Sequence, residues 1–160
     1  MNNWANFFVA MAGGAAALTG LIFVGVSISL TKILSIPKMT GRAFGALIIL
    51  LTALIASAIC LIPDQSPFLT GAELFIIGVI TWVLTLWNDL DMLKNAAPVY
   101  KIHYQINIGL TQLAVLPYII AGAVTSSSGF DGIYWLVPGI LMCFIKAIAD
   151  AWVLLIEIHR

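Results

Sequence analysis

The chain has 160 residues, of which 62% are hydrophobic and only 9% are charged. Soluble domains carry about 25% charged residues, so this composition excludes a chain that covers its surface with polar groups in water and indicates a membrane protein. Seven Lys and Arg balance seven Asp and Glu, and this zero net charge excludes an electrostatic hold on nucleic acid.

Five apolar stretches are long enough to cross a bilayer, which takes about 20 residues per helix. They cover residues 7–30, 43–62, 69–87, 104–124 and 133–156. These stretches use nearly the whole chain and leave no room for a soluble domain. We therefore predict one all-α transmembrane domain over residues 1–160, a polytopic bundle of five helices.

Basic residues in the short connecting segments predict the orientation of the bundle. Those outside the apolar stretches fall on one side of the predicted topology: Lys32, Lys38, Arg42, Lys94, Lys101 and Arg160. The N-terminal tail and the other two connections contain none. The pattern predicts an N-terminus outside the cell and a C-terminus in the cytoplasm.

The first stretch carries small residues along one narrow stripe of a helix. At 100° per residue, Gly13, Ala17, Gly20 and Ser27 share this stripe, and such a surface lets another helix approach closely. A contact within the subunit and a contact between subunits are both open. The segment from Trp4 to Ser29, with its Leu-Thr-Gly-Leu-Ile-Phe-Val run, resembles small bacterial membrane proteins. That resemblance implies no fold or activity. From the apolar spans and their basic connections, we expect an integral protein of the cell (inner) membrane.

Two signals mark the ends of the third stretch. Thr70 and Glu73 match a capping box, which predicts a helix start at Thr70. The run Asn88, Asp89 and Asp91 predicts a solvated helix end, with an oxygen-ligand site for a hard cation as the alternative.

Two further signals predict bends in the last two spans, at Pro117 and at Pro138-Gly139. Both lie in the outer half of the membrane. An apolar gate at that level is the functional alternative to simple packing kinks.

The fifth stretch contains two charges, Lys146 and Asp150, one turn apart on the same helix face. They lie roughly 16 Å and 10 Å from Glu157 at the inner surface. A charge facing lipid at such depth costs at least about 2.5–3.5 kcal/mol, so we predict that both face protein or water. One interpretation is a buried ion pair that fixes helix register; the other is a water-filled cavity open to the cytoplasm.

Polar residues of other spans reach similar depths and favour the cavity. Gln105 and Gln112 share a face of the fourth span, and Gln112 lies about 12 Å deep. Thr52 of the second span reaches a similar level. Our leading hypothesis is a homo-oligomeric channel, or another conduit for small solutes or ions, with its pore at a symmetric interface between subunits. The predicted cytoplasmic vestibule is lined by Lys146, Asp150, Gln112, Gln105, Thr52 and Glu157.

Two other functions stay open. The first is a non-conducting accessory or sensor protein that contacts a partner through its first and fifth spans; the second is a membrane enzyme acting on a lipid or quinone. No catalytic constellation is present, Cys60 and Cys143 lie at different depths, and the two histidines lie on different segments. The sequence therefore does not indicate an enzyme, and it predicts no metal site and no cofactor. The expected partners are membrane lipid, further copies of the chain and small ions.

Overall fold

The computed structural model describes residues 4–36, 39–94, 98 and 101–158, apart from the side chains of residues 157 and 158. Its elements are α1 (Ala5–Ile28), α2 (Leu30–Ser35), α3 (Met39–Ile59), α4 (Pro67–Lys94), α5 (Lys101–Ser128), the 3-10 helix η3 (Phe130–Trp135) and α6 (Leu136–Ile158). The structure is all-helical, and five of its helices are long and apolar enough to span a membrane. The predicted fold class and the number of spans are confirmed at this level, and the chain has the features of an integral membrane protein.

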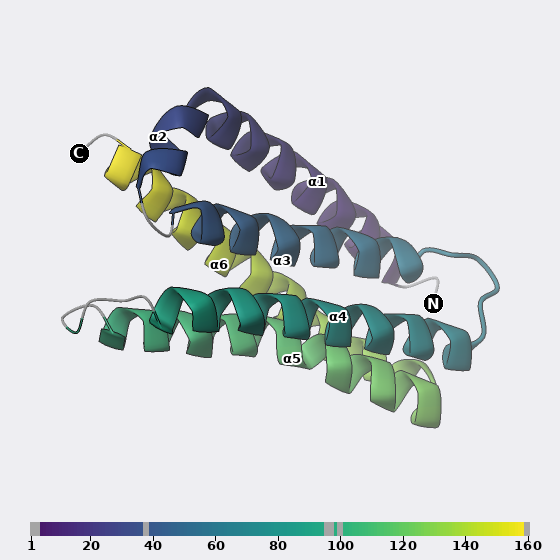
Figure 1. Cartoon of the computed structure of the whole chain (residues 1–160). Helices are drawn as coiled ribbons and strands as arrows, with labels where there is room; N and C mark the ends of the chain where they lie inside the picture. Colours follow the sequence, from purple (N-terminus) through teal and green to yellow (C-terminus); the bar gives the residue numbers. More distant parts are fainter. Residues whose placement is uncertain (1–3, 37–38, 95–97, 99–100, 159–160) are drawn as a thin grey trace.

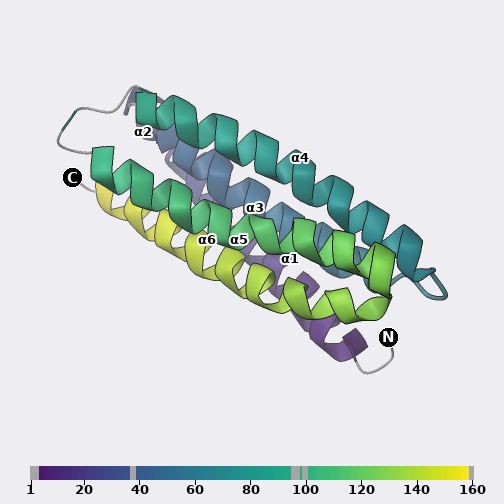
Figure 2. The same cartoon turned by 90° about the horizontal axis from the view of Figure 1, so that it is seen from below.

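Helices α3, α4, α5 and α6 form a closed ring. Each packs against two neighbours: α3 and α5 both contact α4 and α6 (Figures 1 and 2). Helix α1 lies outside this ring, mainly against α3, and meets α6 only slightly. The interior of the ring is therefore the place where one helix face from each of four spans can meet.

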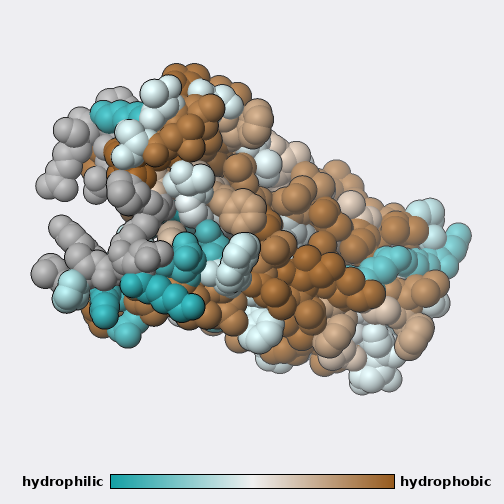
Figure 3. Space-filling view, viewed as in Figure 1, coloured by the Kyte–Doolittle hydropathy of each residue, from teal (hydrophilic) through white to brown (hydrophobic). Residues whose placement is uncertain are grey.

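The two ends of the bundle differ in charge. The N-terminal end of α1 and the α3–α4 connection lie at one end, and α2 and the last turn of α6 lie at the other (Figure 1). We call the latter the basic end, because Lys32, Arg42, Lys94 and Lys101 lie there. Figure 3 shows a hydrophobic belt between the more hydrophilic ends. Which end faces the cytoplasm stays a prediction, and Lys38 and Arg160 lie outside the described residues.

Helices α4 and α5 make the most extensive contact of the bundle, and glycine makes it possible. A Cβ added at Gly122 would lie 2.4 Å from the backbone nitrogen of Phe75, and one added at Gly71 would lie 2.4 Å from the backbone nitrogen of Ser126. Small residues allow this backbone-to-backbone approach where lipid supplies no hydrophobic drive for association.

The capping box predicted at Thr70 is wrong, because the cap of α4 lies one turn earlier, at Ser66. Ser66 caps the helix: its Oγ accepts a hydrogen bond from the backbone N–H of Leu69 (3.3 Å), and Pro67 follows at the first helical position, where no N–H is needed. Thr70 lies inside the helix and donates to Gln65 Oε1 (3.1 Å). Glu73 accepts from Gln65 Nε2 (2.8 Å), so these residues tie the connection to the helix and form no capping box.

The two prolines that predicted bends lie at different places in their helices, and the bends themselves stay predictions. Pro138 lies in the first turn of α6, which begins only at Leu136, and a proline there removes no helical hydrogen bond. Pro117 lies in the interior of α5 and is buried. Gly139 packs against it, because an added Cβ would meet the Pro117 Cβ and the Tyr118 ring, both at 3.1 Å. Pro117 therefore lies at the α5–α6 contact.

Candidate functional site: a polar chamber inside the helix ring

Lys146 and Asp150 face the interior of the ring from α6. Their exposed fractions are 5% and 3%. The Lys146 ammonium donates a hydrogen bond to Asp150 Oδ2, and Arg42 Nη1 donates to Asp150 Oδ1 over 3.4 Å. Asp150 thus holds two cations, one on each carboxylate oxygen.

Arg42 was predicted in a loop, but it lies in the first turn of α3, which begins at Met39. Its side chain is 21% exposed. Arg42 comes from α3 and Asp150 from α6, and the ion pair between them joins these two helices. The partly exposed Arg42 side chain therefore extends from the surface near the basic end to the buried Asp150.

Asp89 supplies a second buried carboxylate from α4, and it is 4% exposed. The predicted solvated helix end is wrong for this residue, because α4 continues to Lys94 and carries Asp89 inward. Its Oδ1 accepts a hydrogen bond from Asn107 Nδ2 (3.3 Å). The Thr111 hydroxyl faces the same carboxylate and donates to the Asn107 carbonyl (3.0 Å). Oδ2 of Asp89 has no hydrogen-bond partner in the described part of the chain.

These side chains surround a small cavity, which we call the polar chamber. The volume open to the centre of a water molecule is about 10 Å³, which is close to the space that one water needs. The wall contains two basic and two acidic residues, so their formal charges cancel. The polar lining consists of Arg42, Thr85, Asn88, Asp89, Asn107, Thr111, Lys146 and Asp150.

Two of the six predicted lining residues, Lys146 and Asp150, lie in the chamber. Thr52 is buried higher in the ring, where its hydroxyl shares a hydrogen bond with that of Thr81 (2.7 Å). Gln112 is half-buried and accepts a hydrogen bond from Trp82 Nε1 (2.6 Å), while its own Nε2 has no partner among the residues described. Gln105 is exposed on α5.

The remaining predicted lining residue, Glu157, lies in the last turn of α6, and its side chain falls outside the described residues. The predicted residues Thr52, Gln105 and Gln112 therefore do not join Lys146 and Asp150 in one vestibule. Other residues of the second and fourth spans line the chamber in their place: Arg42, Asn107 and Thr111.

Sequence reasoning missed Arg42, Asp89, Asn107 and Thr111 as lining residues. Asp89 had a readable signal, because Thr81, Thr85 and Asp89 follow one another at intervals of four and share one helix face. Asn107 and Thr111 have the same spacing on α5. Asp89 lies two residues beyond the predicted end of its span, whereas Asn107 and Thr111 lie inside the predicted fourth span.

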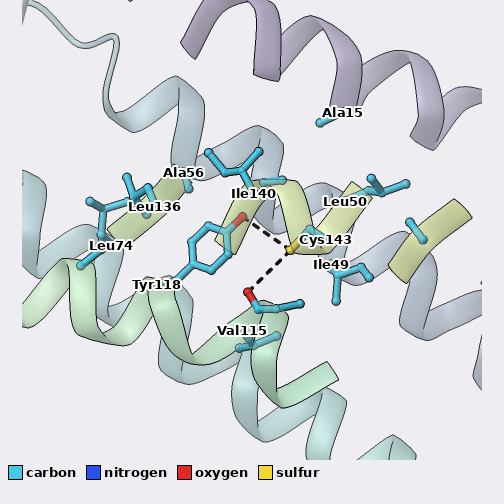
Figure 4. Packing of buried hydrophobic residues seen from close by; sticks show 14 of the residues in the cluster. Ala15, Ile49, Leu50, Ala56, Leu74, Val115, Tyr118, Leu136, Ile140 and Cys143 are labelled. Atoms are coloured by element: carbon cyan, nitrogen blue, oxygen red, sulfur yellow. Dashed lines mark hydrogen bonds between the residues drawn. The ribbon is translucent and has the colours of Figure 1, made fainter. Parts of the chain in front are cut away.

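The half of the ring beyond the chamber is closed by apolar side chains. Leu74, Leu136 and Ile140 are fully buried there. Tyr118 points among them, and its hydroxyl lies 3.5 Å from Cys143 Sγ, which in turn contacts the Ala114 carbonyl at 3.8 Å (Figure 4). The two cysteines are free and buried. Any path from the chamber to the opposite end must pass this apolar section.

The small-residue stripe of α1 does not pack within the chain. Gly13, Ala17, Gly20 and Ser27 are exposed, and a Cβ added at Gly13 or Gly20 would meet nothing within 4 Å. The face of α1 that packs inside the chain consists of Phe8, Ala15 and Ile22. Of the two alternatives for the stripe, a contact within the subunit is not found in the part of the chain that the structure describes, and a contact between subunits stays a prediction.

An apolar groove of about 320 Å³ separates the second half of α1 from α6, and its lining includes Leu21 of α1 and Leu155 of α6. It opens because α1 diverges from α6 toward the basic end (Figure 1). Its wall is almost wholly apolar, which suits a surface in contact with lipid.

No protein family, curated protein or solved structure matches this chain, so the chemistry of its own residues carries the functional argument.

Proposed function

We propose that this chain is a small-ion conduit whose path runs through the interior of each helix ring. The observation that carries the proposal is the polar chamber, a buried, charge-balanced site. One carboxylate oxygen in it has no hydrogen-bond partner among the described residues, and about one water fits. Ionisable side chains inside a membrane domain are costly and commonly mark ion or proton pathways. A pair that served only to fix helix register would need neither the second carboxylate nor the space.

The path belongs inside the subunit in this proposal, which revises the hypothesis of a pore between subunits. Lys146 and Asp150 point into their own ring, where they are buried by α3, α4 and α5. A symmetric interface could not bring these side chains to a shared pore without opening the ring. Because the formal charges of the chamber cancel, Lys146 gives the path no preference for anions.

The entrance we propose is the basic end, where the partly exposed Arg42 covers the chamber. The apolar section around Leu136 and Ile140 is the gate, since a hydrophobic constriction blocks ions until it is wetted. In accord with the excess of basic residues there, we place this end in the cytoplasm and the protein in the cell (inner) membrane.

Ion flux into liposomes tests this function. Purified protein is reconstituted, gradients of H⁺, Na⁺, K⁺ and Cl⁻ are imposed one at a time, and a potential-sensitive dye reports charge movement. We expect wild-type protein to dissipate at least one gradient. Asp150→Asn is expected to slow this flux at least about tenfold, which corresponds to about 1.4 kcal/mol of barrier, because Lys146 and Arg42 then lose their shared anion.

Asp131→Asn is the matched control, because Asp131 is exposed on η3 at the opposite end. It is expected to conduct like the wild type. Protein that remains folded in the liposomes and dissipates no gradient faster than empty liposomes contradicts the proposal.

A second candidate function is a non-conducting accessory or sensor protein. The exposed stripe of α1 favours it, because Gly13 and Gly20 leave room for a helix of another chain, and a further copy is the simplest such partner. In that case the chamber would be a dry structural ion cluster. The same liposome measurement separates the two functions.

A further inference from the structure

Asp89 differs from the other charged residues of the polar chamber in its bonding. Asp150 uses one oxygen for Lys146 and the other for Arg42. Asp89 uses only Oδ1, and its Oδ2 is buried without a hydrogen-bond partner among the residues described. Leaving a buried acceptor unsatisfied is expensive, so a proton or a water molecule is the expected occupant of this position.

The size of the chamber restricts what can occupy it. With about 10 Å³ open to water centres, it holds about one water and has no room for a metal cation together with a hydration shell. Two carboxylates faced by two cations also offer little net attraction for a further cation. A proton needs no such space, because it moves along hydrogen bonds and resides on a side chain.

Every element around Asp89 presents a polar group to it. Arg42 approaches from α3, and Lys146 and Asp150 approach from α6, all close enough to act on the carboxylate electrostatically. Asn107 and Thr111 face it from α5. Thr85 precedes Asp89 by one turn on α4 and lines the same cavity. The nearby positive charges hold the carboxylate in place when it is ionised, and the nearby Asp150 opposes a second permanent negative charge.

Hydroxyl groups continue from Asp89 toward the middle of the membrane. Thr85 and Thr81 follow at intervals of four residues on α4, roughly 6 Å of rise each, and the Thr81 hydroxyl is hydrogen-bonded to that of Thr52 (2.7 Å). A hydroxyl both donates and accepts and can rotate between the two roles. In the structure the Thr85 hydroxyl lies 2.8 Å from the Thr81 carbonyl and the Thr52 hydroxyl lies 2.8 Å from the Ile48 carbonyl, so a proton relay along this row requires these hydroxyls to rotate.

We propose, resting on the function proposed above, that the ion is a proton and that Asp89 Oδ2 is its binding position inside the bundle. A hydronium ion at the basic end transfers its proton, an O–H bond forms at Oδ2, and a neutral carboxylic acid and water result. That O–H bond then breaks, its proton passes to a water molecule on the side of Thr85 to form a new hydronium ion, and the carboxylate is restored. No electrons are exchanged and no other reactant is needed.

Proton uptake by liposomes tests the inference. Vesicles enclose a pH-sensitive dye, and a potassium diffusion potential set with valinomycin drives protons inward. We expect wild-type protein to acidify the interior, Asp89→Asn to lower the rate at least about tenfold, and Asp89→Glu to keep measurable uptake because it retains an acid. Asp91→Asn removes an exposed acid two residues further along the same helix and is expected to match the wild type.

Difference infrared spectroscopy across a pH step gives a second readout that does not depend on flux. We expect a carboxylic acid C=O band in wild-type protein and in Asp91→Asn, and its loss in Asp89→Asn. Wild-type protein that passes Na⁺, K⁺ or Cl⁻ but no protons overturns this inference and leaves the proposed conduit intact. Folded Asp89→Asn that takes up protons at the wild-type rate, or that keeps the infrared band, also overturns it.

Discussion

Replacing Lys146 with methionine is expected to destabilise the folded protein by about 3–5 kcal/mol, because removal of one partner from a buried ion pair leaves the other charge uncompensated. Asp150 would keep only Arg42, which binds it over 3.4 Å from a partly exposed position. The double replacement Lys146→Met with Asp150→Leu is expected to recover most of that loss, since Arg42 can turn to the surface of the basic end.

Thermal or denaturant unfolding in detergent, followed by circular dichroism, measures these differences. Lys101→Met is the matched control, because it makes the same change at the exposed first residue of α5, and it is expected to alter stability by less than about 0.5 kcal/mol. Equal stability of Lys146→Met and Lys101→Met would show that the Lys146–Asp150 pair is not buried in the ring.

Replacing Gly122 with alanine is expected to destabilise the bundle by about 3 kcal/mol, at the upper end of the usual range for overpacking. The added methyl group would approach the backbone nitrogen of Phe75 to 2.4 Å and its Cα to 2.6 Å. These are backbone atoms of α4, so no side-chain rotation relieves the clash, and α4 and α5 must separate.

Gly20→Ala provides the comparison. Nothing lies within 4 Å of its added Cβ, and alanine is favoured over glycine inside a helix by about 1 kcal/mol, so this variant is expected to be as stable as the wild type or slightly more stable. Unfolding in the same detergent compares the two. If both alanine variants were equally stable, the close approach of α4 to α5 would be wrong.

Hydrophobicity and length were sufficient to predict the five spans, because a bilayer demands about 20 apolar residues per helix. The ends of the spans were harder to predict, because several helices extend through polar residues beyond their apolar stretches. Helix α4 reaches Lys94, seven residues beyond the predicted end at residue 87, so Asp89 enters the bundle. A hydrophobicity threshold marks where apolar residues stop, and a helix whose polar side chains find partners inside the protein continues past that point.

The choice of packing face could not be predicted from small residues alone. The stripe containing Gly13 and Gly20 on α1 has the expected pattern yet is exposed, whereas Gly71 and Gly122 make the α4–α5 contact. The useful signal was the seven-residue spacing of Gly71 and Gly78, which puts both on one face of α4.

The candidate site was predicted in part, for a clear physical reason. Lys146 and Asp150 lie deep in an apolar stretch, and the cost of exposing them to lipid shows from the sequence that they face inward. Arg42 and Asp89 lie near the ends of spans, where a charge can equally well be solvated. Only the ring arrangement brings them to Lys146 and Asp150, because α3, α4 and α6 contribute one face each to the same interior.

The central claim is that ions pass through each ring separately, and flux through mixed assemblies tests it most directly. Wild-type and Asp150→Asn chains, with different affinity tags, are co-expressed in varying proportions, purified through both tags where mixed assemblies form, and reconstituted. A path inside each subunit predicts flux that rises in direct proportion to the wild-type fraction. Flux that rises as a higher power of that fraction, as a pore shared between subunits requires, or the absence of flux from fully wild-type protein, would contradict the account.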